Sequence, residues 1–309
     1  MVKQSTLKNI SYFYIVKKLL LLFCFVSSLL NSQILDNKRG LAFTDQPFFD
    51  ENFIKLNKVK KIKGEYTFKK AGDIMRKTPY KSTYEFDASG HLIESFETRS
   101  DDGIKDTIQN MYAYSPSNLL TMHRKKDSGG YGSVYFQYDD AGHIISEETH
   151  RDVFDDKGNL ERTFVINKET MKYDTFPLQQ KKIVFNSYNL PYMEEFSYYN
   201  ADGYLLEKEE RLKMTSGKVK QVYEYNEKGY ISAIRSNASL DGKFAEEWFF
   251  KYDEFGDLIE KHIYKNGVFT TDIQIIYNVD TKLLSSVLTR EVKSNFIMIL
   301  RFMNYEFYK

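Results

Sequence analysis

One seven-residue pattern recurs along most of the chain and limits what the chain can fold into. It consists of an aromatic residue, then Asp, Asn or Ser, two variable residues, Gly, one variable residue, and Leu or Ile. Complete copies begin at Phe86, Tyr138, Tyr199, Tyr225 and Tyr252. Copies in which another residue replaces Gly begin at Tyr114, Tyr173 and Tyr277. Because a regular internal period indicates one structural unit used many times, we expect a repeat fold.

The pattern has the chemistry of a β-hairpin turn. Asp or Asn bonds the backbone two residues on, the variable residues form a type I turn, and Gly takes the left-handed conformation. Such a turn carries a one-residue bulge, so the aromatic residue should face the aliphatic residue directly across the hairpin. The expected pairs are Tyr138 with Ile144, Tyr225 with Ile231, and Tyr252 with Leu258.

A plainer turn lies between successive copies, so each unit contains two strands of roughly 8 to 10 residues. Counting back by two from Tyr252 puts Phe250 and Trp248 on one face, while Lys251 and Glu247 fall on the other. A sheet with one apolar face must curl until its aromatic sides meet, or stack on a second layer. We therefore predict an all-β fold: an antiparallel meander of about 16 to 18 strands, built from hairpin repeats as a curled ribbon or solenoid.

The core Tyr-Asp-x-x-Gly-x-Leu resembles the YD repeats of the Rhs and teneurin class, and the likeness spans about Phe86 to Leu283. The resemblance implies a coiled ribbon of β-hairpins on a secreted or cell-surface protein. Long members form hollow shells around a toxin or serve as adhesion scaffolds. Here the units are longer and too few to enclose a cargo domain, which argues against a toxin-enclosing shell, while the architecture carries over. A MORN-like, antitoxin-type hairpin repeat is the related alternative.

Residues 1–33 have the layout of a secretory signal. Four lysines precede the apolar run Leu19–Leu30, and small polar residues follow it. This run is too short to span a bilayer comfortably, so we predict cleavage, with an uncleaved anchor as the alternative. Cys24, the single cysteine, would leave with the signal; Phe23 before it argues against a lipoprotein site. The remaining chain divides into a lead or capping segment, 34–63, and a repeat domain, 64–309.

Charge and composition exclude several function classes. Lys plus Arg total 44 and Asp plus Glu 43, and removing the four signal lysines leaves 40 against 43. Such a balance does not support nucleic-acid binding. We expect an exported protein, periplasmic, surface-bound or secreted, with no membrane span after cleavage, because alternating charges leave no apolar outer band.

We make two predictions about the segment before the repeats. Phe48–Phe53 should form a short cap over the first hairpin, because the end unit of a repeat array lacks a neighbour. Lys58, Lys60, Lys61 and Lys63 alternate with apolar residues, which indicates the solvated face of an edge strand.

No catalytic, cofactor or metal motif stands out. His91 and His143 occupy the same slot of the repeated turn, and the five histidines form no spaced zinc motif. Paired acids such as Asp139-Asp140 fit turn chemistry better than a calcium loop. Phosphate loops, nucleophile elbows and dinucleotide fingerprints are missing. We therefore predict no enzyme activity and no cofactor.

Three tyrosines are the candidate binding residues. Tyr204 and Tyr230 directly follow turn glycines and should point to the wet face, and Tyr188 lies in a plain turn. Exposed rings in line can stack sugars or anchor a partner protein, although strand propensity alone also accounts for them. The function hypothesis is a non-enzymatic scaffold that binds carbohydrate or a cell-envelope protein. The alternatives are an envelope enzyme with a site assembled from distant turns, and an accessory shell or immunity partner of a secreted toxin.

Overall fold

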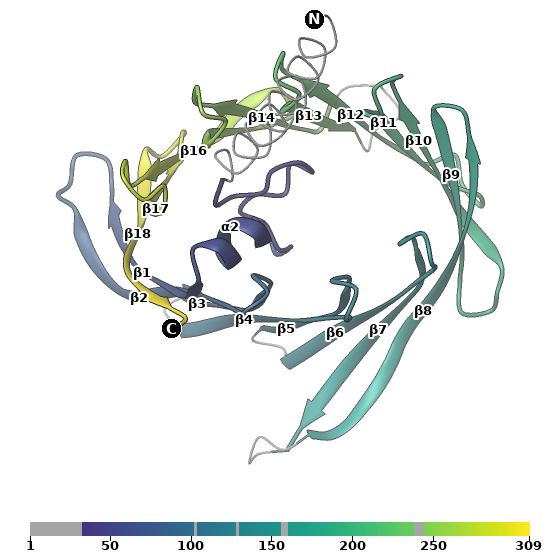
Figure 1. Ribbon diagram of the computed structural model, residues 1–309, viewed down its shortest axis with the longest axis horizontal. Coiled ribbons are helices and arrows are strands. Elements are labelled where there is room, and N and C mark those ends of the chain that lie inside the picture. Colours follow the sequence, from purple (N-terminus) through teal and green to yellow (C-terminus); the bar gives the residue numbers. More distant parts are fainter. Residues whose placement is uncertain (1–32, 102–103, 128–129, 156–159, 238–243) are drawn as a thin grey trace, which may run out of the picture.

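Eighteen antiparallel strands follow one another around a single closed sheet (Figure 1). The computed structural model describes residues 33–101, 104–127, 130–155, 160–237 and 244–309. A short helix, α2 (Glu51–Leu56), precedes the strands. The strands are β1 (Val59–Lys69), β2 (Arg76–Phe86), β3 (Leu92–Asp101), β4 (Ile104–Tyr114), β5 (Leu120–Asp127), β6 (Gly130–Tyr138), β7 (Ile144–Phe154), β8 (Leu160–Phe176), β9 (Gln179–Phe185), β10 (Pro191–Tyr199), β11 (Leu205–Leu212), β12 (Lys218–Tyr225), β13 (Ile231–Asn237), β14 (Glu246–Tyr252), β15 (Leu258–Lys265), β16 (Val268–Tyr277), β17 (Leu284–Glu291) and β18 (Phe296–Phe307). The all-β class, the meander and the strand number are confirmed.

The prediction of a curled ribbon or solenoid is wrong, because the sheet closes. β1 pairs with β2 on one side and with β18 on the other, from Val59 opposite Phe307 to Lys69 opposite Ile297. Twist accumulated along the meander brings the first and last strands together, and their pairing satisfies both rows of edge hydrogen-bonding groups. The repeat specifies each hairpin, whereas closure depends on two strands far apart in sequence.

The hairpin turns have the predicted construction. In the β6–β7 turn, Asp139 Oδ1 accepts hydrogen bonds from the backbone N–H of Ala141 (3.0 Å) and of His143 (2.8 Å). Gly142 is left-handed, with φ at 83°. Tyr138 faces Ile144 across the hairpin beside the expected bulge. The same pairing joins Tyr225 to Ile231 and Tyr252 to Leu258.

The repeated tyrosines also join successive units, which the sequence analysis did not predict. Apart from that of Tyr199, each hydroxyl donates to the carbonyl oxygen of the aliphatic residue that closes the preceding turn. The distances are 2.6 Å from Tyr138 to Leu120, 2.9 Å from Tyr252 to Ile231 and 2.7 Å from Tyr277 to Leu258. The motif therefore fixes both the hairpin and the stagger between neighbouring hairpins.

One assignment within the repeat is wrong. The copy predicted to begin at Tyr173 has a tight turn at Pro177 and Leu178, with Phe176 opposite Gln179. The repeated turn geometry occurs instead at the other end of β9, where Asn189 replaces Gly with φ at 58°. Asn tolerates the left-handed conformation, so the plain turn expected at Tyr188-Asn189 has the same construction as the repeated one.

Residues 33–57, which we call the plug, lie inside the closed sheet (Figure 1). Phe48, Phe49 and Ile54 are buried in one core with inward residues of the barrel, among them Phe86, Leu258 and Leu284. The Phe49 ring packs edge-on against Phe86, 5.0 Å between centroids. The predicted cap at Phe48–Phe53 thus contacts the first hairpin, but from the inside of the barrel, and part of it forms α2.

The outer face carries cross-strand ion pairs. Examples are Lys61–Glu85 (2.7 Å), Lys220–Glu207 (2.6 Å) and Lys251–Glu260 (2.6 Å). The lysine-rich strand β1 is not an edge strand as expected, because it has a neighbour on each side. Among the described residues, no helix has the length and apolar character that a membrane span requires. The predicted signal lies outside the described residues, apart from Gln33.

Candidate functional site

The three candidate tyrosines divide between the two ends of the barrel. Tyr204 lies between β10 and β11, and Tyr230 lies between β12 and β13. Tyr188 lies between β9 and β10, and its side chain is 85% exposed. Because successive turns of a meander alternate between its ends, Tyr188 is at the end opposite the other two. The structure therefore brings Tyr204 and Tyr230 together and leaves Tyr188 apart.

The sequence predicted that Tyr204 and Tyr230 point to the outer wet face. This prediction is wrong. Tyr204 packs on the inward-facing Tyr225, 4.8 Å between ring centroids, and Tyr230 stacks on Tyr252 at 5.0 Å. The left-handed glycine turns the chain so that the following side chain crosses toward the next hairpin. A methyl group added at Gly229 would overlap the Tyr204 hydroxyl, so this glycine also leaves room for the ring.

These rings line a cleft of about 550 Å³ at the end of the barrel, which we call the mouth cleft. Its barrel side consists of the Tyr204, Tyr225, Tyr230 and Tyr252 rings with the adjoining turns, and its plug side runs from Gln33 to Lys38 and includes Asp50. The cleft thus has an aromatic wall facing a polar one.

Hydrogen bonds across the cleft fix its tyrosines. Asn37 Nδ2 donates to the Tyr252 hydroxyl at 2.9 Å, and Gln33 Nε2 lies 3.5 Å from the Tyr230 hydroxyl. Burial raises the pKa of Tyr252 to about 12, although the Asn37 amide opposes the shift. This hydroxyl therefore stays protonated at neutral pH and can both donate and accept hydrogen bonds.

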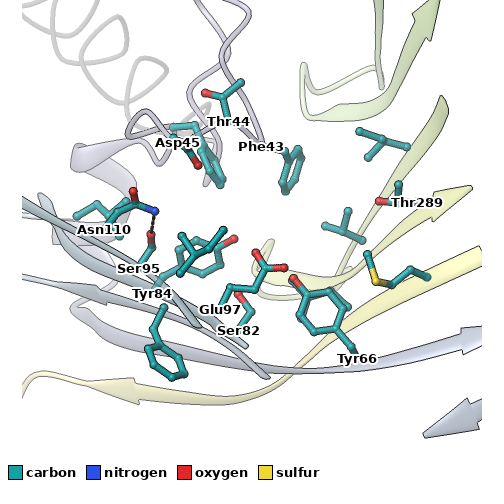
Figure 2. A pocket seen from close by; sticks show the side chains of 18 of the residues that line it. Phe43, Thr44, Asp45, Tyr66, Ser82, Tyr84, Ser95, Glu97, Asn110 and Thr289 are labelled. Atoms are coloured by element: carbon teal, nitrogen blue, oxygen red, sulfur yellow. Dashed lines mark hydrogen bonds between the residues drawn. The ribbon is translucent and has the colours of Figure 1, made fainter. Parts of the chain in front are cut away.

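A second cavity, of about 270 Å³, lies between the plug and the barrel wall (Figure 2). We call it the inner pocket. In Figure 2, Tyr66, Ser82, Tyr84 and Glu97 of β1, β2 and β3 point toward one another beneath Phe43 of the plug. The lining from β16–β18 is apolar apart from Thr289, and β3 and β4 contribute both polar and apolar residues. Besides Glu97, the polar ones are Ser95, Asn110 and Tyr112, and the apolar ones are Leu92, Phe96 and Ile108.

The polar groups of the inner pocket are held in place by one another. Asn110 Nδ2 donates to Ser95 Oγ at 3.2 Å, and the Tyr112 hydroxyl donates to the Asp45 carbonyl oxygen at 2.7 Å. Burial, together with the nearby Glu97 carboxylate, raises the pKa of Tyr66 far above its usual value. Burial also raises the pKa of Tyr84 to about 12. Both hydroxyls are neutral hydrogen-bonding groups at physiological pH.

The inner pocket was not predicted from the sequence, although the sequence contains a signal for it. Counting back by two from Phe86 and Tyr114 identifies the inward face, and this face carries Ser82 and Asn110 among its aromatic residues. Both side chains are buried. A polar residue that interrupts an apolar face is the pattern that marks such a site.

A polar wall lies on the inward face of β9–β11. Glu195 accepts from Lys182 and from Lys208, each at 2.8 Å, and Lys208 also contacts Glu210 at 3.2 Å. Burial alone would raise the pKa of Glu195, but the two lysines hold it below its usual value. Because these charged side chains pair with one another, we interpret the polar wall as a structural network of ion pairs.

The histidines act as parts of the repeat. His91 stacks on Tyr114 at 4.4 Å, and His143 stacks on Tyr173 at 4.7 Å. Each Nδ1 atom lies about 3 Å from the aspartate that opens its own turn, Asp87 or Asp139. Within the described part of the chain, no group of three or more His, Cys, Asp or Glu side chains is placed to hold a metal ion.

Comparisons with known proteins leave the family open. No protein-family description and no curated protein matches the sequence. A porin-like protein from Bacteroides uniformis is similar at 10% identity and a TM-score of 0.34, over 81% of this chain and 97% of the other. The Tc holotoxin pore of Photorhabdus luminescens is similar at 11% identity and 0.19, over 72% of this chain and 19% of the other. A DUF1329 family protein from Desulfovibrio piger is similar at 6% identity and a TM-score of 0.16, over 83% of this chain and 89% of the other. At these values the likenesses establish neither a family nor a function.

Proposed function

We propose that this protein is an exported, non-enzymatic binding protein of the cell envelope, and that it binds carbohydrate at the mouth cleft. The observation that carries the proposal is the ladder of four tyrosine rings, Tyr204 on Tyr225 and Tyr230 on Tyr252, opposite the amides of Gln33 and Asn37. Sugar rings have apolar faces that pack on aromatic side chains and hydroxyl edges that hydrogen-bond to amides. Pockets of about 300 to 1,000 Å³ are typical of small-molecule sites.

The geometry supports a rigid site. The Tyr252 and Tyr225 hydroxyls are fixed to the carbonyl oxygens of Ile231 and Leu205, each at 2.9 Å. Tyrosines held in this way lose little conformational entropy when they contact a ligand. The Tyr204 side chain, 38% exposed, stays accessible from solution.

The test is binding of the mature chain to a glycan array and to isolated cell-envelope fractions. Changing Tyr204→Ala and Tyr230→Ala together should abolish glycan binding while the unfolding midpoint stays within a few degrees of wild type. Tyr188→Ala is the matched control, because it removes an exposed tyrosine from the opposite end of the barrel. Unchanged binding by the double variant, or loss of binding by Tyr188→Ala alone, would contradict the mouth cleft as the site.

The enzyme alternative has one observation in its favour. Two carboxylates, Glu97 and Asp45, line the inner pocket, and glycoside hydrolysis uses a pair of carboxyl groups. Asp45, however, forms an ion pair with Lys125, which occupies one of the two groups. Incubation with chromogenic aryl glycosides separates the two functions, because turnover that Glu97→Gln removes would replace the binding proposal with a hydrolase.

A partner-protein role follows from the repeat resemblance and remains the other candidate. Co-purification from the native cell, followed by identification of bound proteins, distinguishes it from glycan binding. A single stoichiometric partner that competes with the glycan for the mouth cleft would favour the protein ligand.

A further inference from the structure

The inner pocket is separate from the mouth cleft and has its own chemistry. The two cavities share no lining residue among those described. The pocket lies between Phe43–Asp45 and Phe48 of the plug and the inward faces of β1–β4 and β16–β18. A ligand here would contact the plug and the wall at once.

The charged and hydroxyl groups of the barrel lining gather on β1–β4, whereas the lining from β16–β18 is apolar apart from Thr289. Glu97, Ser82, Ser95 and the tyrosine hydroxyls lie on β1–β4 beside the apolar Leu92, Phe96 and Ile108. A flat molecule with hydroxyl groups at its edge and C–H groups on its faces matches this division. A polyhydroxylated six-membered ring has this distribution of groups.

The volume of the inner pocket and the charges in its lining further limit the class of ligand. An engineered cavity of about 150 Å³ holds benzene, so about 270 Å³ has room for a single substituted ring. Both charged side chains in the lining, Glu97 and Asp45, are carboxylates, and Asp45 is paired with Lys125. An anionic ring would be repelled by Glu97, and a neutral ring would not.

The polar side is already ordered for binding. Contacts among Ser95, Asn110, Tyr112 and Asp45 fix its groups in the structure as it stands. A carboxylate such as Glu97 accepts several hydrogen bonds and forms stronger ones than a neutral acceptor. Ordered groups cost little entropy on binding, which favours a specific small ligand.

We propose that the inner pocket binds one neutral monosaccharide, with Glu97 and Ser82 accepting hydrogen bonds from its hydroxyl groups and with its C–H face against Phe43. The site is independent of the mouth cleft. Binding ties the plug to the wall, because Phe43–Asp45 belong to the plug and Glu97 to β3.

The test is isothermal titration of the full mature chain with a panel of methyl hexopyranosides, and with a hexuronate as the anionic comparison. At least one neutral glycoside should bind, and the hexuronate should bind about tenfold or more weakly than that glycoside. Glu97→Gln should weaken binding about tenfold, the effect of losing a charge-assisted hydrogen bond. Tyr188→Ala, at the opposite end of the barrel and outside both cavities, should leave the affinity unchanged.

A second variant and a second measurement distinguish a loss of binding from misfolding of the variant. Ser82→Val replaces the hydroxyl with two methyl groups, so it removes the hydrogen-bond acceptor, narrows the pocket and should abolish binding. The unfolding midpoint reports whether the barrel is intact. Hydrogen exchange with the glycoside present should slow at the Phe43–Phe48 amides in wild type. The proposal is overturned if no glycoside binds at millimolar concentration, if Glu97→Gln and Ser82→Val both bind as wild type does, or if Tyr188→Ala removes the binding.

Discussion

At the scale of single residues, the turn glycines serve two purposes that the structure separates. Gly142 and Gly90 are both left-handed, with φ at 83° and 97°. Nothing lies within 4 Å of the position that a methyl group would take at Gly142, whereas at Gly90 it would overlap the backbone of Glu51 in the plug. The first glycine is required by conformation alone, and the second by conformation and by the plug.

These two glycines make a matched pair of variants. Gly142→Ala should lower the free energy of unfolding by about 1 kcal/mol, the cost of a left-handed alanine. Gly90→Ala should lower it by about 1 to 3 kcal/mol more, because the methyl group must displace the plug. Urea unfolding of both variants measures the difference. Equal losses would mean that the plug does not rest on this turn.

Burial of the charged Lys261 side chain has a measurable cost in the free energy of folding. It is 2% exposed, donates to the Ala42 carbonyl oxygen at 3.1 Å, and lies 4.0 Å from the Trp248 ring centroid. Burial lowers its pKa to about 8, with a small opposing effect from Glu246. Between pH 8 and the ordinary lysine value, the unfolded chain therefore binds more protons than the folded one.

This difference predicts that stability rises with pH over that window. Relative to Lys261→Met, the wild-type free energy of unfolding should increase from pH 8 to about pH 10, with a slope of at most about 1.4 kcal/mol per pH unit. Below pH 8 both states carry the charge, so the difference between the two proteins should be constant. Urea titrations at pH 7, 8, 9 and 10 test this, and a difference that falls as pH rises would contradict it.

At the scale of elements, the plug is a short segment whose order depends on the barrel. A helix of six residues is not stable alone, and α2 owes its order to the burial of Phe53 and Ile54 and to its cap. Asp50 caps the helix at its N-terminus. Its side chain accepts a hydrogen bond from the Phe53 N–H at 2.8 Å, and its own N–H donates to the Ile34 carbonyl oxygen at 3.0 Å.

Removing the cap should loosen the plug locally. Asp50→Ala should cost about 1 kcal/mol and speed hydrogen exchange at the α2 amides. Asp50→Asn is the control, since its amide oxygen can accept the same hydrogen bond, and it should keep most of the protection. Exchange rates measured by mass spectrometry on peptides covering residues 33–57 give the result, and equal protection in the alanine variant would show that packing alone orders the segment.

At the scale of the whole molecule, closure joins the two ends of the meander. The β1–β18 ladder covers both edges, and the Tyr308 hydroxyl adds a hydrogen bond of 2.6 Å to the Phe86 carbonyl oxygen. An open form would expose two long strand edges, which are sites of aggregation. Closure therefore affects solubility as well as stability.

A chain that ends at Glu291, and so lacks β18, should form larger assemblies than wild type. The exposed edges of β1 and β17 would pair with other molecules, and size-exclusion chromatography should show dimers or larger species. Tyr308→Phe is the control, because it removes one hydrogen bond and keeps the ladder, so it should elute with wild type. A monomeric, cooperatively unfolding truncated chain would show that the seam is dispensable.

Local chemistry determined the part of the fold that the sequence alone could predict. The turn pattern specifies which residues face one another, as with Tyr138 and Ile144, because Asp, Gly and the bulge act within seven residues. The apolar and charged faces follow from side-chain alternation along each strand. Tyr204 and Tyr230 were identified as candidates for the same reason, since their slot in the repeat is a local property.

The tertiary structure alone decided closure, the position of the plug and the two cavities. Each depends on segments far apart in sequence: β1 beside β18, Ala42 beside Lys261, and Phe43 opposite Glu97. The direction of Tyr204 was also decided there, because the ring packs on the next hairpin and not on its own. Such contacts arise from accumulated sheet twist and the burial of the plug, which no short-range pattern encodes.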